Sequence, residues 1–188
     1  MADYPVPWIP ALWAAWALYW AFSAAGRFRV VKAEGSSRFH YRVPLVLAAL
    51  ALLGPRLWPE LDGRIIPETV TGEVLGTVLL ALGLGLAVVA RVHLGVHWSG
   101  RIALGADHHL VRSGPYRFMR HPIYSGVLLA FAGTAVAFGD WRSVVALAIA
   151  VAALWTKLRR EERMMAARFA GEYADYQARV AALVPGLL

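Results

Sequence analysis

Five long apolar segments constrain this chain more than any other feature of its sequence. They run over about 7–25, 43–58, 71–92, 122–138 and 141–156. A helix that spans a bilayer needs about 20 largely apolar residues, because each residue advances about 1.5 Å through a hydrocarbon core of about 30 Å. The last two segments are separated only by Gly139 and Asp140, which predicts a tight helical hairpin. We therefore expect five transmembrane helices.

The composition supports contact with lipid. Of the 188 residues, 59% are hydrophobic and 16% are charged, whereas soluble domains carry roughly 45–50% apolar and about 25% charged residues. A soluble domain of this length has too little interior to hide so much apolar surface. The formal charge of +7 comes from basic residues scattered between the apolar segments, which we interpret as loops beside anionic lipid rather than a nucleic-acid interface. The absence of cysteine excludes disulfides and thiolate metal sites.

The charges of the loops alternate along the chain. The loops after the first and third segments and the tail after the fifth are rich in basic residues, whereas the loop after the second segment and the hairpin tip are not. Because cytoplasmic loops carry an excess of Lys and Arg, this alternation predicts an outer N-terminus and a cytoplasmic C-terminus. The first segment has no positive charge before it, so we expect a span rather than a cleaved signal peptide.

These features predict one all-α membrane domain over 1–188, located in the inner (cytoplasmic) membrane. Three spans occupy 7–92, and a loop, the helical hairpin and a C-terminal amphipathic helix occupy 93–188. Gly72 and Gly76 in the third span have the four-residue spacing of a close helix–helix contact.

Histidine and aromatic side chains concentrate in the loop before the fourth segment, which the charge pattern places in the cytoplasm. Five of the six histidines lie there, namely His93, His97, His108, His109 and His121. Pro122 suits the first turn of the fourth helix, where its missing N–H costs nothing. Tyr124 follows His121 by three residues, so the two side chains share a helix face. Gly126 leaves room for the close approach of a ligand or another helix.

Two adjacent glutamates follow the fifth segment on a predicted amphipathic helix. The apolar residues at helical spacing are Leu158, Met165, Phe169, Tyr173 and Val180. Glu162 falls on this apolar face, and Glu161 lies about 100° away. A buried carboxylate needs a partner, and the candidates are Arg120, His121 or a ligand cation. Alternatively, both glutamates are solvated or pair with basic neighbours such as Lys157.

In order and spacing, these motifs resemble the isoprenylcysteine carboxyl methyltransferase and phospholipid methyltransferase superfamily. The match covers roughly 91–185, and its motifs are LGVHWS (94–99), HHLVRSGPY (108–116), RHPIYSG (120–126), EE (161–162) and FAGEYADY (169–176). The combination is specific, although each motif alone is weak. Two positions depart from the pattern: Val96 stands where a basic residue is common, and Ala170 interrupts the usual Phe-Gly pair.

The resemblance implies a membrane enzyme that uses S-adenosyl-L-methionine to methylate a lipophilic acceptor at the cytoplasmic face. The loop, the last two spans and the C-terminal helix would form the cofactor pocket, and the acceptor would arrive laterally between helices. The candidate cofactor-binding residues are His108, Leu110, Val111, Tyr116, Arg120, His121, Pro122, Tyr124, Gly126, Glu161, Glu162 and Tyr173.

The chemistry of these side chains suits the parts of the cofactor. Glu161 or Glu162 would hold the ammonium group, and Arg120 or His121 the carboxylate. The backbone around 110–111 would meet the adenine edge. The tyrosines of the set would face the sulfonium, because aromatic faces attract positive charge.

No catalytic base is assigned, because the need for one depends on the acceptor. A carboxylate, with a pKa near ~4, is already nucleophilic. An amine must lose a proton, and His97, His108 or His121 would then be the candidate bases. The acceptor stays open among an isoprenylated carboxylate, a phospholipid headgroup amine, and a small lipophilic thiol or alcohol.

Two oxidoreductase readings compete with methyl transfer. A membrane di-iron hydroxylase needs more histidines, in separated motifs, than the six present, so we expect no metal. NADPH-dependent sterol reductases share part of the C-terminal pattern but are typically longer, with more spans.

Overall fold

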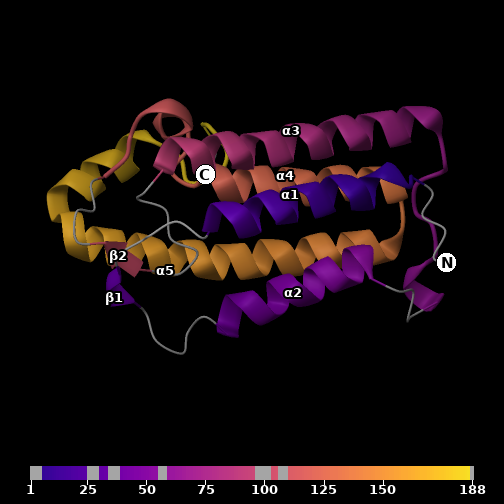
Figure 1. Ribbon diagram of the computed structural model, residues 1–188, viewed down its shortest axis with the longest axis horizontal. Coiled ribbons are helices and arrows are strands. Elements are labelled where there is room, and N and C mark those ends of the chain that lie inside the picture. The colour runs from indigo at the N-terminus through magenta and orange to yellow at the C-terminus, as the bar shows by residue number, and fades with distance from the viewer. Residues whose placement is uncertain are drawn as a thin grey trace.

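The computed structural model describes residues 6–24, 30–33, 39–54, 59–95, 103–105 and 110–186. Within these ranges, five long helices run side by side along the longest dimension of the molecule (Figure 1). They are α1 (Trp8–Ala24), α2 (Phe39–Leu53), α3 (Val70–Leu94), α4 (Pro122–Phe138) and α5 (Trp141–Arg179). The shorter elements are the 3-10 turns η2 (Pro59–Leu61) and η4 (Gly114–Arg117) and the strands β1 (Val30–Ala33) and β2 (Ala103–Gly105).

Each predicted apolar segment corresponds to one of these helices. The bounds of α4 match the predicted 122–138, and α1 and α3 match within two residues. Helix α2 begins at Phe39 rather than near 43. Pro44 therefore lies inside the helix and not in its first turn. Helix α2 also ends earlier than predicted, at Leu53; residues 55–58 lie outside the described part of the chain.

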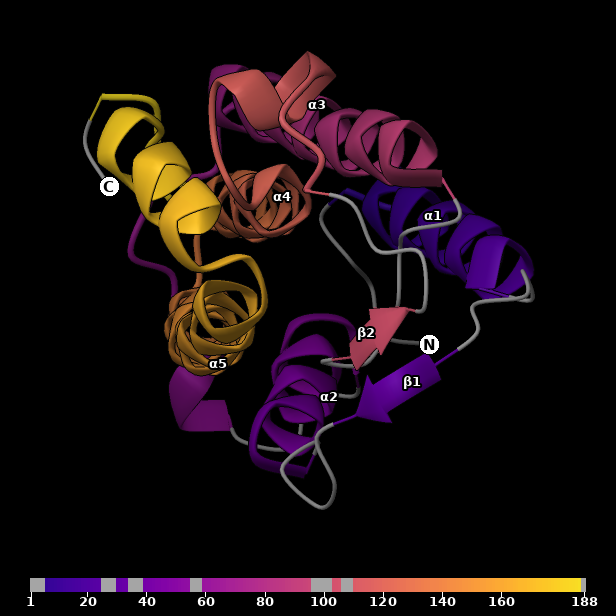
Figure 2. The same cartoon turned by 90° about the vertical axis from the view of Figure 1, so that its left-hand side faces the viewer.

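The predicted fifth span and the predicted C-terminal helix are joined in α5. The helix continues past the apolar part over 141–156 and carries both glutamates before its backbone breaks at Ala170 (φ 40°, ψ −118°). The turns after this break lie beside α4 when the molecule is viewed from its end (Figure 2).

A short antiparallel strand pair is the departure from the predicted all-α class. Strand β1 pairs with β2, with Val30 opposite Gly105 and Ala33 opposite Ala103. Strands this short carry little periodicity, and their partners lie far apart in the sequence, so the sequence alone did not predict them. The pair lies at the same end of the bundle as η4 (Figure 1).

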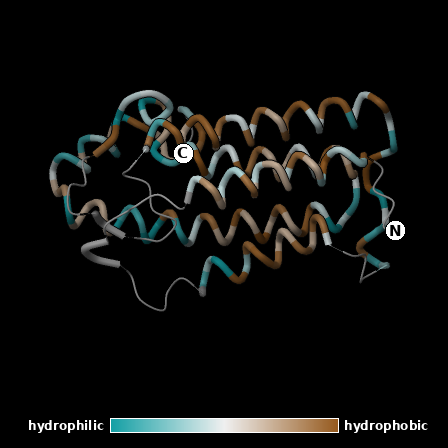
Figure 3. Tube along the Cα trace, viewed as in Figure 1, coloured by the Kyte–Doolittle hydropathy of each residue, from teal (hydrophilic) through white to brown (hydrophobic). Residues whose placement is uncertain are grey.

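The helices have the apolar character of a membrane protein. Helix α3, with 25 residues, and the apolar part of α5 are long and apolar enough to cross a membrane, whereas α4 and 40–53 of α2 are apolar but shorter. Valine and leucine side chains on α3, such as Val74 and Leu82, are exposed, as expected for contact with lipid. Hydrophilic residues gather towards the ends of the helices (Figure 3).

Helices α3 and α4 pack against each other through glycines. A Cβ added to Gly83 would lie 2.5 Å from the backbone N of Ala130 and from the carbonyl O of Gly126. A Cβ added to Gly76 would lie 2.5 Å from the carbonyl O of Gly133. These four glycines let the two backbones approach closely, as small residues do in membrane helix pairs.

Of the two glycines predicted at a helix–helix contact, Gly76 makes the tighter approach to α4. A Cβ on Gly72 would lie 4.0 Å from the carbonyl O of Val136 on α4 and 3.1 Å from Oγ1 of Thr69. That hydroxyl caps the start of α3 by accepting a hydrogen bond from the N–H of Gly72 at 3.1 Å.

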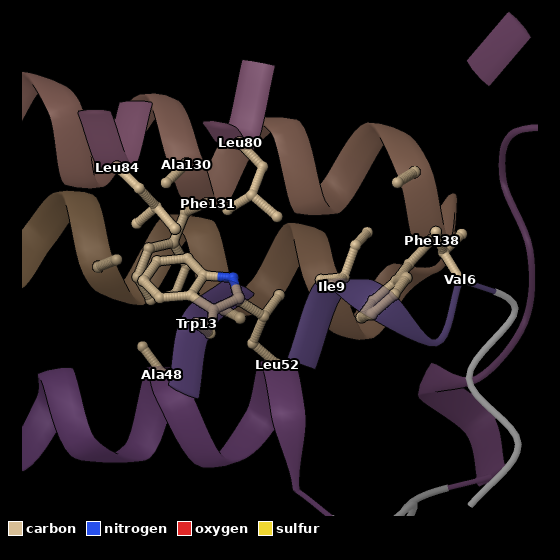
Figure 4. Packing of buried hydrophobic residues seen from close by; sticks show 13 residues of the cluster. Val6, Ile9, Trp13, Ala48, Leu52, Leu80, Leu84, Ala130, Phe131 and Phe138 are labelled. Carbon is tan, nitrogen blue, oxygen red and sulfur yellow. The ribbon is translucent and has the colours of Figure 1, made fainter. Parts of the chain in front are cut away.

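All five helices or their flanks contribute to one apolar core (Figure 4). Trp13 of α1 packs edge-on against Phe131 of α4, with ring centroids 5.1 Å apart. Its indole N–H donates to Oγ1 of Thr134 at 3.1 Å, so this buried polar group is satisfied. At the turn between α4 and α5, Asp140 caps α5 by accepting a hydrogen bond from the N–H of Ser143 at 2.9 Å.

Candidate functional site

The candidate site lies where α4 begins. His121 is the N-cap of α4 and Pro122 its first residue, as the sequence predicted. The backbone N–H groups of Arg120 and His121 donate to the carbonyls of Ala181 (2.8 Å) and Ala182 (3.0 Å). The start of α4 is thereby bound to the segment after α5, which brings three parts of the sequence together.

A buried ion pair forms the centre of this site. Nε and Nη2 of Arg120 each lie 2.7 Å from Oε1 of Glu162. Both side chains are buried, so the partner required for a carboxylate on the apolar face of the last helix is Arg120. Arg120 also donates through Nη1 to the carbonyls of Val180 and Gln177. The arginine thus holds α4, α5 and the C-terminal segment together.

His121 lies against the same carboxylate. Its ring stacks on Tyr124 with centroids 5.3 Å apart and planes inclined by 6°. Nε2 lies 3.4 Å from Oε1 of Glu162 and Nδ1 lies 3.8 Å from Oε2 of Glu161. Within the described part of the chain, Nε2 is buried and has no hydrogen-bond partner of good geometry. Because buried polar atoms are nearly always hydrogen-bonded, Nε2 is a candidate contact for a ligand.

Glu161 belongs to a second, more open cluster. Tyr124 donates its hydroxyl to Oε2 of Glu161 at 2.6 Å. Nζ of Lys157 lies 3.7 Å from Oε1, one helical turn earlier on α5. The alternative of a Glu161–Lys157 pair, left open by the sequence, is therefore realised, whereas Glu162 pairs with Arg120.

The electrostatics of the site keep Glu162 ionised. This residue lies beyond the apolar part of α5. Burial by itself would raise the pKa of Glu162, but the neighbouring His121 and Arg120 outweigh this effect and lower the pKa to about 2. The tyrosines behave oppositely: burial raises the pKa of Tyr176 to about 12 and also raises the pKa of Tyr173. Both tyrosines therefore stay neutral hydrogen-bond donors at neutral pH.

Tyr116 joins the cluster through its backbone. Its carbonyl accepts a hydrogen bond from the hydroxyl of Tyr176, which fixes η4 against the end of α5. The ring of His93 stacks on Tyr116 at 6.4 Å, and its Nε2 lies 2.9 Å from Oγ of Ser113. Sequence reasoning did not select Tyr176 as a site residue, although it shares the apolar helix face with Tyr173.

The remaining predicted residues divide into three groups. Leu110 and Val111 are partly exposed and lead into η4. Gly126 lies against α3, where a Cβ would meet the carbonyl of Gly83 at 2.5 Å, so the room it leaves is filled by a helix. His97, His108 and His109 lie outside the described residues.

Comparison with known proteins bears directly on this arrangement. The family model of phospholipid methyltransferase matches residues 71–172, which is more than half of the chain. The chain belongs to the phospholipid methyltransferase family. The residues matched to this family run from the start of α3 to Glu172 and include Arg120, His121 and both glutamates, whereas α1 and α2 precede them.

Individual relatives match a larger share of the chain than the family model does. It is 36% identical over 146 residues to the cobalt-zinc-cadmium resistance protein CzcN of Cupriavidus metallidurans, covering 77% of this chain and 61% of that protein. It is 32% identical over 113 residues to protein-S-isoprenylcysteine O-methyltransferase B of Arabidopsis thaliana, covering 58% of this chain and 57% of that protein. The chain thus spans about six-tenths of the length of these curated relatives.

The fold is shared with a solved structure. The eukaryotic intramembrane Ras methyltransferase, isoprenylcysteine carboxyl methyltransferase, matches with a TM-score of 0.56 and 23% identity, covering 82% of this chain and 54% of that chain. At this identity the match establishes a common fold.

Proposed function

We propose that this chain is an integral membrane methyltransferase that uses S-adenosyl-L-methionine to methylate a lipophilic acceptor at the cytoplasmic face. The observation that carries the proposal is the cluster of Arg120, His121, Tyr124, Glu161 and Glu162, which joins α4 to α5 within the part matched to the family.

The residues present fit the charges of the cofactor. Nε2 of His121 is buried, lies 3.4 Å from Oε1 of Glu162 without a hydrogen bond of good geometry in the described part of the chain, and can donate to a carboxylate of the cofactor. The carboxylate of Glu161 is more exposed than that of Glu162 and can accept from an ammonium group. The ring of Tyr173 offers an aromatic face to positive charge, whereas the ring of Tyr124 already contacts His121 and Lys157. His108, Leu110 and Val111 would complete the binding site on the adenine side.

S-adenosyl-L-methionine supplies a methyl group on a positively charged sulfur, which an acceptor attacks in line. The chain's own contribution is to position the two reactants and exclude water. Arg120 fixes Glu162 and the C-terminal segment, and Glu162 orients the ring of His121. Well-aligned reactants can lower a barrier by about 7–11 kcal/mol, so positioning accounts for much of the rate without a catalytic base.

The five helices would span the membrane with the N-terminus outside and the site end in the cytoplasm. The basic loops support this orientation, and the start of α1 lies at the opposite end of the bundle from the start of α4 (Figure 1). A reporter fused to the C-terminus should be active in the cytoplasm. Activity only on the outer side would overturn the orientation.

Calorimetric titration of the detergent-solubilised protein with S-adenosylhomocysteine tests the cofactor, with NADPH as a parallel ligand and metal content measured on the same sample. We expect saturable binding of S-adenosylhomocysteine. Binding of NADPH or bound iron in its place would favour an oxidoreductase.

Two variants test the site itself. Glu162→Gln and His121→Ala should each weaken S-adenosylhomocysteine binding about tenfold or more, because each removes a charged or hydrogen-bonding group, while the protein stays folded. Glu68→Gln is the matched control, since Glu68 is an exposed carboxylate paired with Arg64 at the far end of the bundle. Wild-type affinity in both folded site variants would refute the assignment.

A further inference from the structure

A buried lysine at the edge of the site has no role in the function proposed so far. Lys157 lies on α5 with its side chain only 13% exposed. Its Nζ lies 5.2 Å from the ring centroid of Tyr41 on α2 and 5.0 Å from that of Tyr124 on α4. Two aromatic rings from different helices therefore hold one ammonium group between them.

The surroundings of Nζ leave its hydrogen-bond donors available. An ammonium group has three N–H donors, and aromatic rings stabilise its charge through their faces without acting as conventional acceptors. The nearest carboxylate oxygen, Oε1 of Glu161, lies 3.7 Å away, beyond ordinary hydrogen-bond length. In the described part of the chain, Nζ makes no hydrogen bond. The cage thus fixes a cation and leaves it able to bind an anion.

This cation lies next to the group assigned to the cofactor. Tyr124 contacts Nζ with its ring and donates its hydroxyl to Glu161, so Lys157 and the proposed ammonium-binding carboxylate share one tyrosine. Tyr41, the other wall of the cage, is buried and lies outside the family match, in the N-terminal half. Lys157 therefore lies between the cofactor side and α2.

The charges around Lys157 determine which kind of headgroup can bind beside it. Arg120 is compensated by Glu162, and Lys157 by Glu161. A bound cofactor adds one net positive charge, because its ammonium and sulfonium exceed its carboxylate by one. An ammonium headgroup would add another cation next to Lys157 in a site partly shielded from water, where like charges repel strongly. An anionic headgroup would instead restore neutrality.

Resting on the proposed function, we infer that Lys157, held between Tyr41 and Tyr124, is a specificity-determining residue that binds the acceptor's headgroup and selects an anion over an amine. The lysine donates hydrogen bonds to the anionic group and holds it beside the cofactor. Tyr41 and Tyr124 position the lysine.

The test measures headgroup preference in protein saturated with sinefungin, an unreactive analogue of S-adenosyl-L-methionine that carries an ammonium group in place of the sulfonium and so keeps the net positive charge, in an uncharged detergent. Three probes share a twelve-carbon tail and differ only in the headgroup: dodecanoate, dodecanol and dodecylamine. Wild-type protein should bind dodecanoate about tenfold more tightly than the other two. Lys157→Met should abolish this preference, and Lys157→Arg should retain most of it. Tyr41→Leu should reduce the preference, whereas Tyr41→Phe, which keeps the ring, should not.

Arg159→Met is the matched control, because it removes one positive charge from an exposed position two residues along α5. An equal effect of Arg159→Met and Lys157→Met would mean that net charge, not the cage, sets the preference, and would overturn the inference. So would equal or tighter binding of dodecylamine by the wild type, or a carboxylate preference that survives in Lys157→Met. Failure of S-adenosylhomocysteine to bind the wild type would instead reject the proposed function itself.

Discussion

Helix α4 makes two contacts that are built in opposite ways. Along its length it meets α3 through glycine backbone, with Gly126 and Gly133 opposite Gly83 and Gly76. At its first turn it meets α5 through charged and hydrogen-bonded side chains, with Arg120 on Glu162 and Tyr124 on Glu161. The first contact depends on the absence of side chains, and the second depends on their identity.

On α4, the contact with α3 therefore serves the fold, whereas the contact with α5 belongs to the candidate site. Backbone packing in the glycine contact cannot adapt to an added atom, because protein interiors are already close-packed. The polar contact leaves donors and aromatic faces for a ligand, and a substitution of similar size there changes charge more than shape. Substitutions in the glycine contact should therefore act on folding alone, and those in the polar contact on ligand binding as well as on stability.

The largest expected effect comes from breaking the glycine contact. Gly83→Ala places a Cβ 2.5 Å from backbone atoms of Gly126 and Ala130, so the helices must separate. Overpacking typically costs about 1–3 kcal/mol, and a rigid backbone contact should lie at or above the upper end. We expect a large loss of thermal stability in detergent, with little folded protein.

Gly85→Ala is the control for that experiment. Gly85 lies on the same helix two residues later, and a Cβ there would meet nothing within 4 Å. Its stability should be unchanged or slightly raised, because alanine favours helix more than glycine does. Equal losses in the two variants would show that helix propensity or expression, rather than the α3–α4 contact, sets the effect.

The same comparison explains what the sequence could predict. The bounds of α4 were predicted to the residue because Pro122 and Gly139 mark its ends. The need of Glu162 for a partner followed from the cost of burying a lone carboxylate on an apolar helix face, and Arg120 was one of the candidates. Both predictions depend on local chemistry that one segment displays.

Features that depend on two distant segments were missed or predicted only in part. The tightest glycine contacts use Gly76 and Gly83, seven residues apart, whereas the spacing in the sequence pointed to Gly72 and Gly76. The cage of Lys157 needs Tyr41, and nothing in either segment specifies the other. The β1–β2 pair is likewise nonlocal. Such contacts are set by how helices pack, which periodicity within one helix does not encode.

An intermediate effect should follow when the polar contact loses its charge. Glu162→Gln leaves Arg120 buried without a counter-ion, which should lower the free energy of unfolding by about 2–3 kcal/mol at neutral pH. The pKa of Glu162 is lowered from 4.5 to about 2 in the folded chain. Its contribution to stability is therefore fully present above pH 4.5 and is lost as the pH falls towards 2.

Unfolding measured at several pH values checks this sign. The stability difference between wild type and Glu162→Gln should be constant from pH 8 to about 5 and should shrink as the pH falls towards 2. Glu68→Gln, at the exposed pair with Arg64, should differ little from wild type throughout, because surface pairs contribute about 0–1 kcal/mol. A difference for Glu162→Gln that stayed constant down to pH 2 would mean that side-chain packing, not charge, stabilises the contact.

The smallest expected effect concerns the kink of α5, which lies between Glu162 of the polar contact and the buried Tyr173 and Tyr176. Ala170 is exposed and has a φ of 40°, a backbone conformation that favours glycine. Ala170→Gly should relieve this strain and raise the free energy of unfolding by about 0.5–1 kcal/mol. Ala174→Gly, exposed on the regular helix one turn later, should instead lower it by about 1 kcal/mol. Thermal unfolding should show shifts of opposite sign, with S-adenosylhomocysteine affinity unchanged in Ala170→Gly, because Ala170 only sets the direction of the chain. A stability loss in both variants would show that the kink does not require a glycine-like backbone.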